Sequence, residues 1–184
     1  MNYQVTTRQV TVPAREFIAR YRDVERIRQY CTQCPSFGKV WSCPPFDYDA
    51  RDVSNGFATV SVTGTTIEFD EQTRAACATH EQSAAAGREA MTQVWQSLLP
   101  QLYEQERSVP GSRCFTFRCT LCSERCSRAD GLPCRHPDRM RHSLEAVGFD
   151  VVAITRDLLG IELQWSADGM LPRCITIVTA LMMP

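Results

Sequence analysis

Four cysteines lie within one stretch of sixteen residues, CTLCSERCSRADGLPC: Cys119, Cys122, Cys126 and Cys134. Their spacing, C-x2-C-x3-C-x7-C, can bring four thiolates around one point without help from the rest of the fold. Zinc accepts four thiolates, but structural zinc sites usually combine two C-x2-C pairs from separated segments. Here one short segment supplies all four, as in bacterial ferredoxins that wrap a [4Fe-4S] cluster, although the later spacings are longer than theirs. The motif favours an iron–sulfur cluster, with zinc as the alternative.

A second group of cysteines lies near the N-terminus, in YCTQCPSFGKVWSCPPF. It comprises Cys31, Cys34 and Cys43, in the spacing C-x2-C-x8-C, and a proline follows both Cys34 and Cys43. Proline after a ligand removes a donor and stiffens the loop, as it does at the last ligand of ferredoxin motifs. Gly38 allows the backbone to fold tightly. We expect a second metal site here, with zinc or no metal as the alternative.

The second group supplies only three local ligands. The fourth ligand could come from Cys77, Cys114 or Cys174, from a histidine or an aspartate, or be absent. An absent ligand would leave one iron open to a substrate. For the three remaining cysteines we favour a place in the core, because free cysteine often behaves as a small buried hydrophobe.

Other side chains add less to this picture. His136 lies two residues after Cys134 and could bond a cluster sulfur or the backbone, while His80 and His142 fall on predicted helices. Seven arginines surround the four-cysteine motif and would offset its negative charge; a solvated basic face and docking of an acidic redox partner protein are alternatives. They are Arg113, Arg118, Arg125, Arg128, Arg135, Arg139 and Arg141.

Composition narrows the class of protein. The chain has 184 residues, ten cysteines and a formal net charge of −1, with 20 basic and 21 acidic side chains. This balance gives no indication of nucleic acid or an anionic membrane as partner. A chain of this size can form a core without disulfides, and no N-terminal apolar run resembles a signal peptide. We therefore expect a cytoplasmic protein whose cysteines bind metal, rather than a secreted disulfide scaffold.

Periodicity predicts the elements that position these motifs. Residues 3–11 suit an edge strand, and residues 57–69 a strand with a turn or bulge at Gly64. Helical spacing is present at 14–30 and 70–107, and in HPDRMRHSLEAVG, where Gly148 would be the C-terminal cap. Residues 174–183 are a predicted strand and CFTF a short one, while residues 149–157 are predicted as a strand that could continue as a helix. The stripe predicted to be buried on the long helix is Val94, Trp95, Leu98, Leu99, Leu102 and Tyr103.

This order of elements predicts an α+β fold (or α/β), with a mixed sheet packed against helices. Residues 1–184 would form a single metal-binding domain. Two cysteine-rich loops interrupt it, cysteine loop one at 31–46 and cysteine loop two at 114–137.

With both motifs quoted, the chain resembles a family of bacterial and archaeal predicted metal-binding proteins, domain-of-unknown-function family 2284. The matching stretches are the first motif and CTLCSERCSRADGLPCRHPDRMRHSLEAVGFDV. The resemblance implies a setting in anaerobes but brings no known reaction. It also implies metal binding by the seven motif cysteines: Cys31, Cys34, Cys43, Cys119, Cys122, Cys126 and Cys134.

Three functions are consistent with these motifs. The first is an iron–sulfur protein with one or two [4Fe-4S] clusters, acting in electron transfer, in redox sensing or as an accessory to a partner enzyme. The second is an enzyme whose three-cysteine motif keeps an open iron, an idea that a fourth cysteine close to this motif would oppose. The third is a zinc-stabilised binding module. No Ser-His-Asp order, HxxxH pair or Gly-rich phosphate loop points to a conventional hydrolase or transferase.

Overall fold

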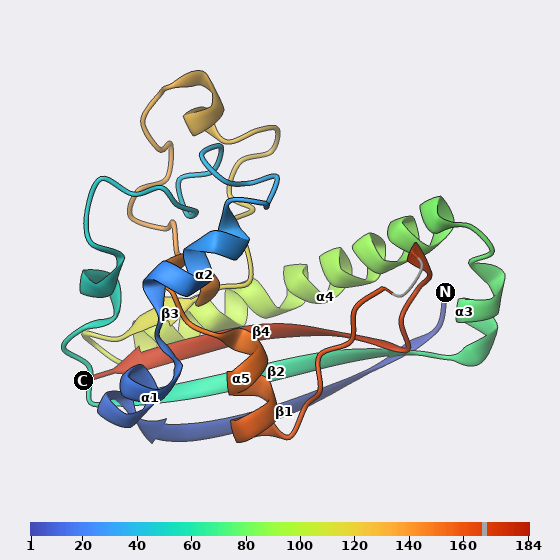
Figure 1. The fold of residues 1–184 in the computed structure, drawn as a ribbon, viewed down its shortest axis with the longest axis horizontal. Coiled ribbons are helices and arrows are strands. Elements are labelled where there is room, and N and C mark those ends of the chain that lie inside the picture. The colour runs from blue at the N-terminus through green and yellow to red at the C-terminus, as the bar shows by residue number, and fades with distance from the viewer. Residues whose placement is uncertain (167–168) are drawn as a thin grey trace.

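A four-stranded antiparallel sheet forms the centre of the protein. The computed structural model describes residues 1–166 and 169–184 (Figure 1). The sheet order is β1-β2-β4-β3, with β1 (Tyr3–Pro13), β2 (Thr59–Phe69), β3 (Arg113–Phe115) and β4 (Cys174–Met183). The predicted α+β class and the edge strand near the N-terminus are confirmed. The sheet is antiparallel throughout, however, where the sequence analysis predicted a mixed one.

Helices cover both faces of this sheet because its strands are apolar on both sides. On β2, the even-numbered residues Val60 and Val62 belong to one core, and the odd-numbered residues Ile67 and Phe69 belong to a second core on the opposite face. The first core lies under α1 (Ala14–Tyr21), α5 (Val151–Ile154) and the π-helical turn η4 (Thr155–Leu159); the second lies under α4 (His80–Ser108). Figure 1 shows α4 along one face and α1 and α5 against the other.

Two helices predicted as continuous are each divided. The first is interrupted after α1, and α2 (Val24–Cys31) begins behind Asp23, whose side chain accepts a hydrogen bond from the main chain of Arg26. The second is divided into α3 (Glu71–Ala76) and α4, because Thr79 and Gln82 form a capping box that starts a new helix. In both cases a side chain that bonds the backbone outweighs the continuous apolar spacing.

The bulge expected at Gly64 is wrong. The register is continuous on both sides, with Arg8 and Val178 as the partners of Gly64. A Cβ atom here would lie 2.8 Å from the Leu159 side chain and 2.9 Å from that of Ile161. Glycine therefore permits close approach of the π-helical layer to the sheet.

Two predictions after cysteine loop two are also wrong. The segment 136–148 is mostly irregular and ends in a 3-10 turn, η3 (Glu145–Val147), although Gly148 caps that turn with φ of 93°. The strand expected at 149–157 is absent, and the helix considered as its continuation is present, as α5 and η4. Asp150 caps α5 by accepting a hydrogen bond from the main chain of Ala153. Short 3-10 helices complete the elements: η1 (Ala50–Ser54) and η2 (Ser127–Asp130).

The predicted stripe of α4 faces the sheet. Val94, Trp95 and Leu102 are buried, and Leu98 and Leu99 pack against them from partly buried positions. The core position expected for the remaining cysteines is confirmed for Cys77 and Cys114; Cys174 is half-buried. Within the described ranges, none of the helices combines the length and apolar character needed to cross a membrane.

Candidate metal centre

The two cysteine loops form one lobe at the end of the sheet. Loop one leaves the C-terminus of α2, loop two leaves β3, and Figure 1 shows them beside one another. The main-chain N–H of Trp41 donates a hydrogen bond to Sγ of Cys126 over 3.4 Å, and its indole Nε1 donates to the oxygen of Leu132 over 3.0 Å. Trp41 and Cys126 are 85 residues apart in the sequence, so the two loops are in contact although they are distant along the chain.

Arg128 of loop two binds directly to the backbone of loop one. Its guanidinium donates to the main-chain oxygens of Val40 at 3.1 Å, Cys43 at 2.6 Å and Pro45. It also lies over the Trp41 ring, 5.0 Å from the centroid. A planar group with five donors suits several carbonyls at once, which lysine could not match. We call this arrangement the Arg128 clamp.

The sulfurs of loop two accept main-chain hydrogen bonds. The N–H of His136 donates to Sγ of Cys134 at 3.4 Å, and Cys126 accepts from Trp41 in the same way. Burial raises the pKa of the Cys119 thiol, while a main-chain hydrogen bond from Leu121 acts in the opposite direction. Donors aimed at sulfur stabilise negative charge there, as metal or cluster ligation requires. This donor set fits a thiolate-bound metal centre.

The three cysteines of loop one have a different environment. Cys31, Cys34 and Cys43 line a cavity of about 1320 Å³. The pKa of Cys43 is raised to about 11, chiefly by burial and also by the neighbouring Cys34, Cys31 and Cys119, while a hydrogen bond from Ser42 acts in the opposite direction. Burial also raises the pKa of Cys31, helped by Glu145, whose main-chain oxygen lies 3.9 Å from Cys31 Sγ. These thiols would lose protons on binding a metal.

A buried histidine holds loop one to the body of the protein. His142 is 2% exposed; its Nδ1 bonds the oxygen of Ser42 and its Nε2 the hydroxyl of Tyr48, both at 2.9 Å. Burial lowers the pKa of His142 from 6.5 to about 4, so the ring is neutral at neutral pH. The ring also packs edge-on against Phe46. The helix predicted at His142 is absent, and both nitrogens of its ring have a hydrogen-bond partner.

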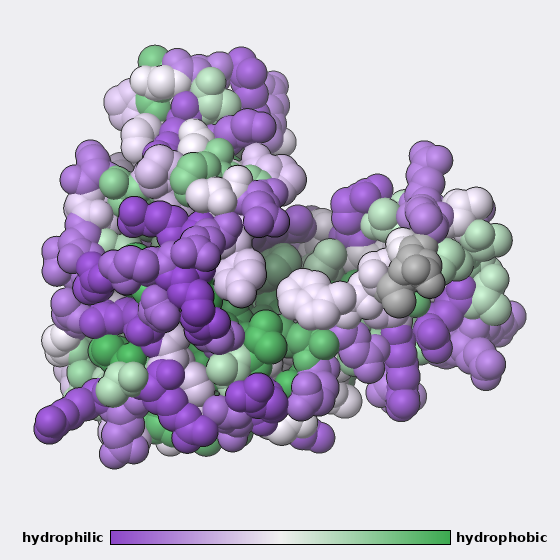
Figure 2. Space-filling model, viewed as in Figure 1, coloured by the Kyte–Doolittle hydropathy of each residue, from purple (hydrophilic) through white to green (hydrophobic). Residues whose placement is uncertain are grey.

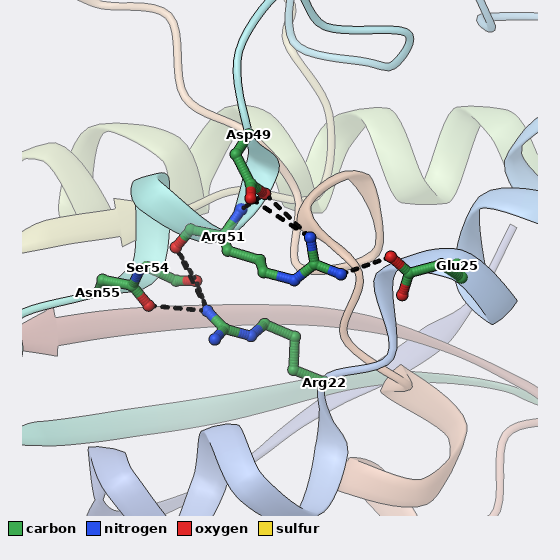
Figure 3. Close-up of polar contacts among 6 residues, drawn as sticks. All are labelled: Arg22, Glu25, Asp49, Arg51, Ser54 and Asn55. Atoms are coloured by element: carbon green, nitrogen blue, oxygen red, sulfur yellow. Dashed lines mark hydrogen bonds and ion pairs between the residues drawn. The ribbon is translucent and has the colours of Figure 1, made fainter.

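Ion pairs and hydrogen bonds tie the two ends of loop one together (Figure 3). Arg51, in η1, pairs with Asp49 and reaches across to Glu25 on α2. Arg22, between α1 and α2, donates to Ser54 Oγ and Asn55 Oδ1 at 3.0 Å each. The segment that carries the three cysteines is therefore closed at its base by contacts between residues that precede and follow it.

Loop two is anchored at its base on α4. Arg141 pairs with Glu106 at 2.8 Å, and both side chains are largely buried. Burial alone would raise the pKa of Glu106, but hydrogen bonds from Arg141 and from the main chain of Cys114 outweigh it and lower that pKa. The hydroxyl of Tyr103 donates to the oxygen of Arg139 at 2.8 Å. Nearer the cysteines, Thr120 Oγ1 accepts a hydrogen bond from the indole Nε1 of Trp95 on α4 at 3.3 Å.

The structure distributes the predicted ligands over two neighbouring groups. Among the described residues, no three His, Cys, Asp or Glu side chains converge in the arrangement that would hold a single metal ion. Of the cysteines considered for the missing ligand of loop one, none of Cys77, Cys114 and Cys174 lines its cavity. A histidine and an aspartate were the other candidates, and His80 and Asp150 both line it, as do Cys119 and Glu145. The contacts made by Glu145, His142 and Arg128 were not predicted from the sequence. The only signal was the position of Arg128 between two ligand cysteines.

The fold and the cysteine lobe define a cysteine-rich metal-binding protein. A family model described as predicted metal-binding protein (DUF2284) matches residues 19–183. The chain belongs to this family, as its two motifs indicated. No curated protein and no solved structure matches the chain.

Proposed function

We propose that this metal-binding protein carries iron–sulfur clusters and acts in electron transfer or redox sensing in the cytoplasm, as an accessory to a partner enzyme. Cys119, Cys122, Cys126 and Cys134 would hold one [4Fe-4S] cluster. The three cysteines of loop one would hold a second. When bound, such clusters accept and release single electrons.

The hydrogen bonds to sulfur in loop two carry this proposal. Two of its four sulfurs, those of Cys126 and Cys134, accept a main-chain N–H at 3.4 Å each. Hydrogen bonds to cluster sulfurs are one of the means by which proteins set a reduction potential. Ligands from one short segment, rather than from two separated pairs, support a cluster over zinc.

The contact between the loops supports a role in electron transfer. Trp41 of loop one bonds the sulfur of Cys126, and Cys43 lies close enough to Cys119 for their charges to interact. Two clusters in this lobe would be neighbours, separated by a few side chains. An electron received at one loop could then pass to the other.

Anaerobic purification with metal and sulfide analysis tests the proposal. We expect a brown protein that absorbs broadly near about 400 nm and contains about eight irons, roughly four per cluster. A colourless protein with one or two zinc ions would contradict it and support a zinc-stabilised binding module instead.

One observation favours a second candidate, an enzyme with an open iron. Cys31, Cys34 and Cys43 face a large cavity, so a substrate could reach a metal held by them. Cys119 lines the same cavity and would complete the site if it were free, but its thiol also interacts with Cys122, Cys126 and Cys134. Addition of cyanide to the reduced protein separates the two cases: a changed cluster EPR spectrum requires an open iron, and an unchanged one opposes it.

A further inference from the structure

The cavity beside loop one has the features of a small-molecule site. Its volume of about 1320 Å³ exceeds the roughly 300–1,000 Å³ typical of ligand pockets. Figure 2 shows it as a hollow with an apolar floor between the cysteine lobe and the N-terminal part of α4. The apolar residues that line it include Met91, Phe117, Leu171, Ile175 and Val178.

Exposed apolar side chains gather at this cavity. Eight large hydrophobic side chains of the described residues are exposed, and four of them line it: Tyr30, Val152, Trp165 and Met170. Trp165 is 74% exposed and Tyr30 is 65% exposed. Apolar surface concentrated around a hollow marks a binding site more often than scattered single residues do.

Two arginines contribute to the wall of the cavity. Arg88 and Arg118 both line it. Arg118 donates to the hydroxyl of Thr92 at 3.0 Å, and Thr92 lies one turn of α4 beyond Arg88. Side chains four apart on a helix are neighbours, so Arg118 bonds a residue that is next to Arg88 on the surface of α4. Within the part of the chain that the structure describes, neither forms an ion pair.

The acidic groups of the cavity do not neutralise this pair. Asp150 is already paired with Arg26 at 2.8 Å and caps α5. The Glu145 carboxylate lies close enough to Cys31 for their charges to interact, and within the described residues it pairs with neither arginine. The charge left at Arg88 and Arg118 is positive, next to an apolar floor. Guanidinium groups bind carboxylate and phosphate oxygens through paired hydrogen bonds.

We propose that this cavity binds a small organic anion: an apolar body on the floor, with its carboxylate or phosphate group at Arg88 and Arg118. The site goes beyond the proposed iron–sulfur function and does not depend on which metal the loops hold. Since Cys31, Cys34, Cys43 and Cys119 line the same space, the bound molecule would lie next to the metal lobe.

Eight-carbon probes that differ only in their polar end test this site. Octanoate, octyl phosphate, octanol and octylamine are titrated into the anaerobically purified protein, with metal content measured on the same sample. Binding is followed by calorimetry and by tryptophan fluorescence, to which Trp165 contributes. We expect octanoate or octyl phosphate to bind at least about tenfold more tightly than octanol, and octylamine to be the weakest. The tighter of the two anions identifies the anionic group.

Paired variants locate the contact. Arg88→Gln with Arg118→Gln is expected to weaken anion binding about tenfold and leave octanol binding unchanged. Arg15→Gln with Arg74→Gln removes the same charge from exposed positions on α1 and α3 that do not line the cavity, and should bind like the wild type.

Three results would overturn the proposal: no probe binds, octanol binds as tightly as both anions, or the Arg88/Arg118 variant keeps full anion affinity. Sedimentation of the wild type tests whether a second copy of the chain occupies the cavity instead. A dimer that binds none of the probes would show that it does. The probe series alone decides the matter if the double variant does not fold. Metal content reports the iron–sulfur proposal separately, because anion binding without iron, or iron without anion binding, refutes only one of the two.

Discussion

The two cysteine loops occupy one lobe but differ in what surrounds their sulfurs. Loop two has main-chain N–H donors on two of its four sulfurs, from Trp41 to Cys126 and from His136 to Cys134. Loop one folds through its own main-chain turns, among them Cys34 N–H to Cys31 O and Cys43 N–H to Val40 O at 3.0 Å each, and its three cysteines line a cavity. The difference teaches that loop two surrounds its sulfurs with donors, whereas loop one presents its cysteines to open space.

Thiol reactivity should expose this difference most strongly. Burial raises the pKa of Cys43 from 9.0 to about 11, so its thiolate fraction at pH 8 falls about 100-fold on folding. We expect iodoacetamide to modify Cys43 in the metal-free folded protein about 100-fold more slowly than in the unfolded chain. Mass spectrometry of timed digests measures the rate at each cysteine. Cys43 should be the slowest of the seven loop cysteines; modification as fast as that of Cys122 would show that the fold does not protect the Cys43 thiol.

The pH dependence of stability should identify His142 as the support of loop one. Its pKa is about 4 in the folded protein and 6.5 ordinarily, so the unfolded chain binds the proton first as pH falls. The stabilisation is complete above about pH 6.5 and is lost as pH falls towards 4, by roughly 3 kcal/mol in total. Arg113 and Arg141 contribute to the lowered pKa, after burial.

Denaturant titrations of the metal-free protein between pH 7 and 4.5 measure this loss. In His142→Phe, the plot of unfolding free energy against pH should lose the slope that one titrating proton contributes. The carboxyl groups titrate alike in both proteins, so their contributions cancel in the difference. At pH 7 the variant should be less stable by about 2 kcal/mol, because two buried hydrogen bonds are lost. Equal slopes in the two proteins would show that His142 is already charged in the fold.

The Arg128 clamp should have the smallest effect of the three. Lysine keeps the charge at this position but cannot reach the oxygens of Val40, Cys43 and Pro45 together. We expect Arg128→Lys to destabilise the contact between the loops by about 1.4 kcal/mol, seen as about tenfold faster amide exchange at Trp41. Arg125→Lys is the matched control, since Arg125 is exposed and pairs only with Asp130. Equal exchange in the two variants would show that the clamp does not join the loops.

Much of the fold was readable from local patterns. Alternation predicted the strands that became β1 and β2, a continuous apolar run predicted β4, and helical spacing predicted the buried side of α4. The failures lie where tertiary contacts outweigh those patterns. The segment 136–148 is not helical in the structure, where Arg141 binds Glu106 and His142 binds Ser42. Periodicity carries no information on such partners.

The metal lobe was predictable only in part for the same reason. The spacing of cysteines gave the two groups, because each group lies within a short segment. The bond from Trp41 to Cys126 joins residues 85 positions apart, and no local pattern predicts it. Glu145 was placed on a predicted helix and instead lies in the cavity beside Cys31. Tertiary contacts, rather than local sequence, therefore determine which loop a ligand serves.

Iron and acid-labile sulfide counts in two reciprocal variants test the central claim, that each loop holds its own iron–sulfur centre. Cys122→Ser and Cys34→Ser are purified anaerobically beside the wild type, with Cys174→Ser, which lies outside both loops, as the control. The account predicts about eight irons in the wild type and the control, and about four in each loop variant, because serine is a poor ligand for a site built on soft thiolates. Unchanged iron in either loop variant, or zinc in place of iron throughout, would contradict it.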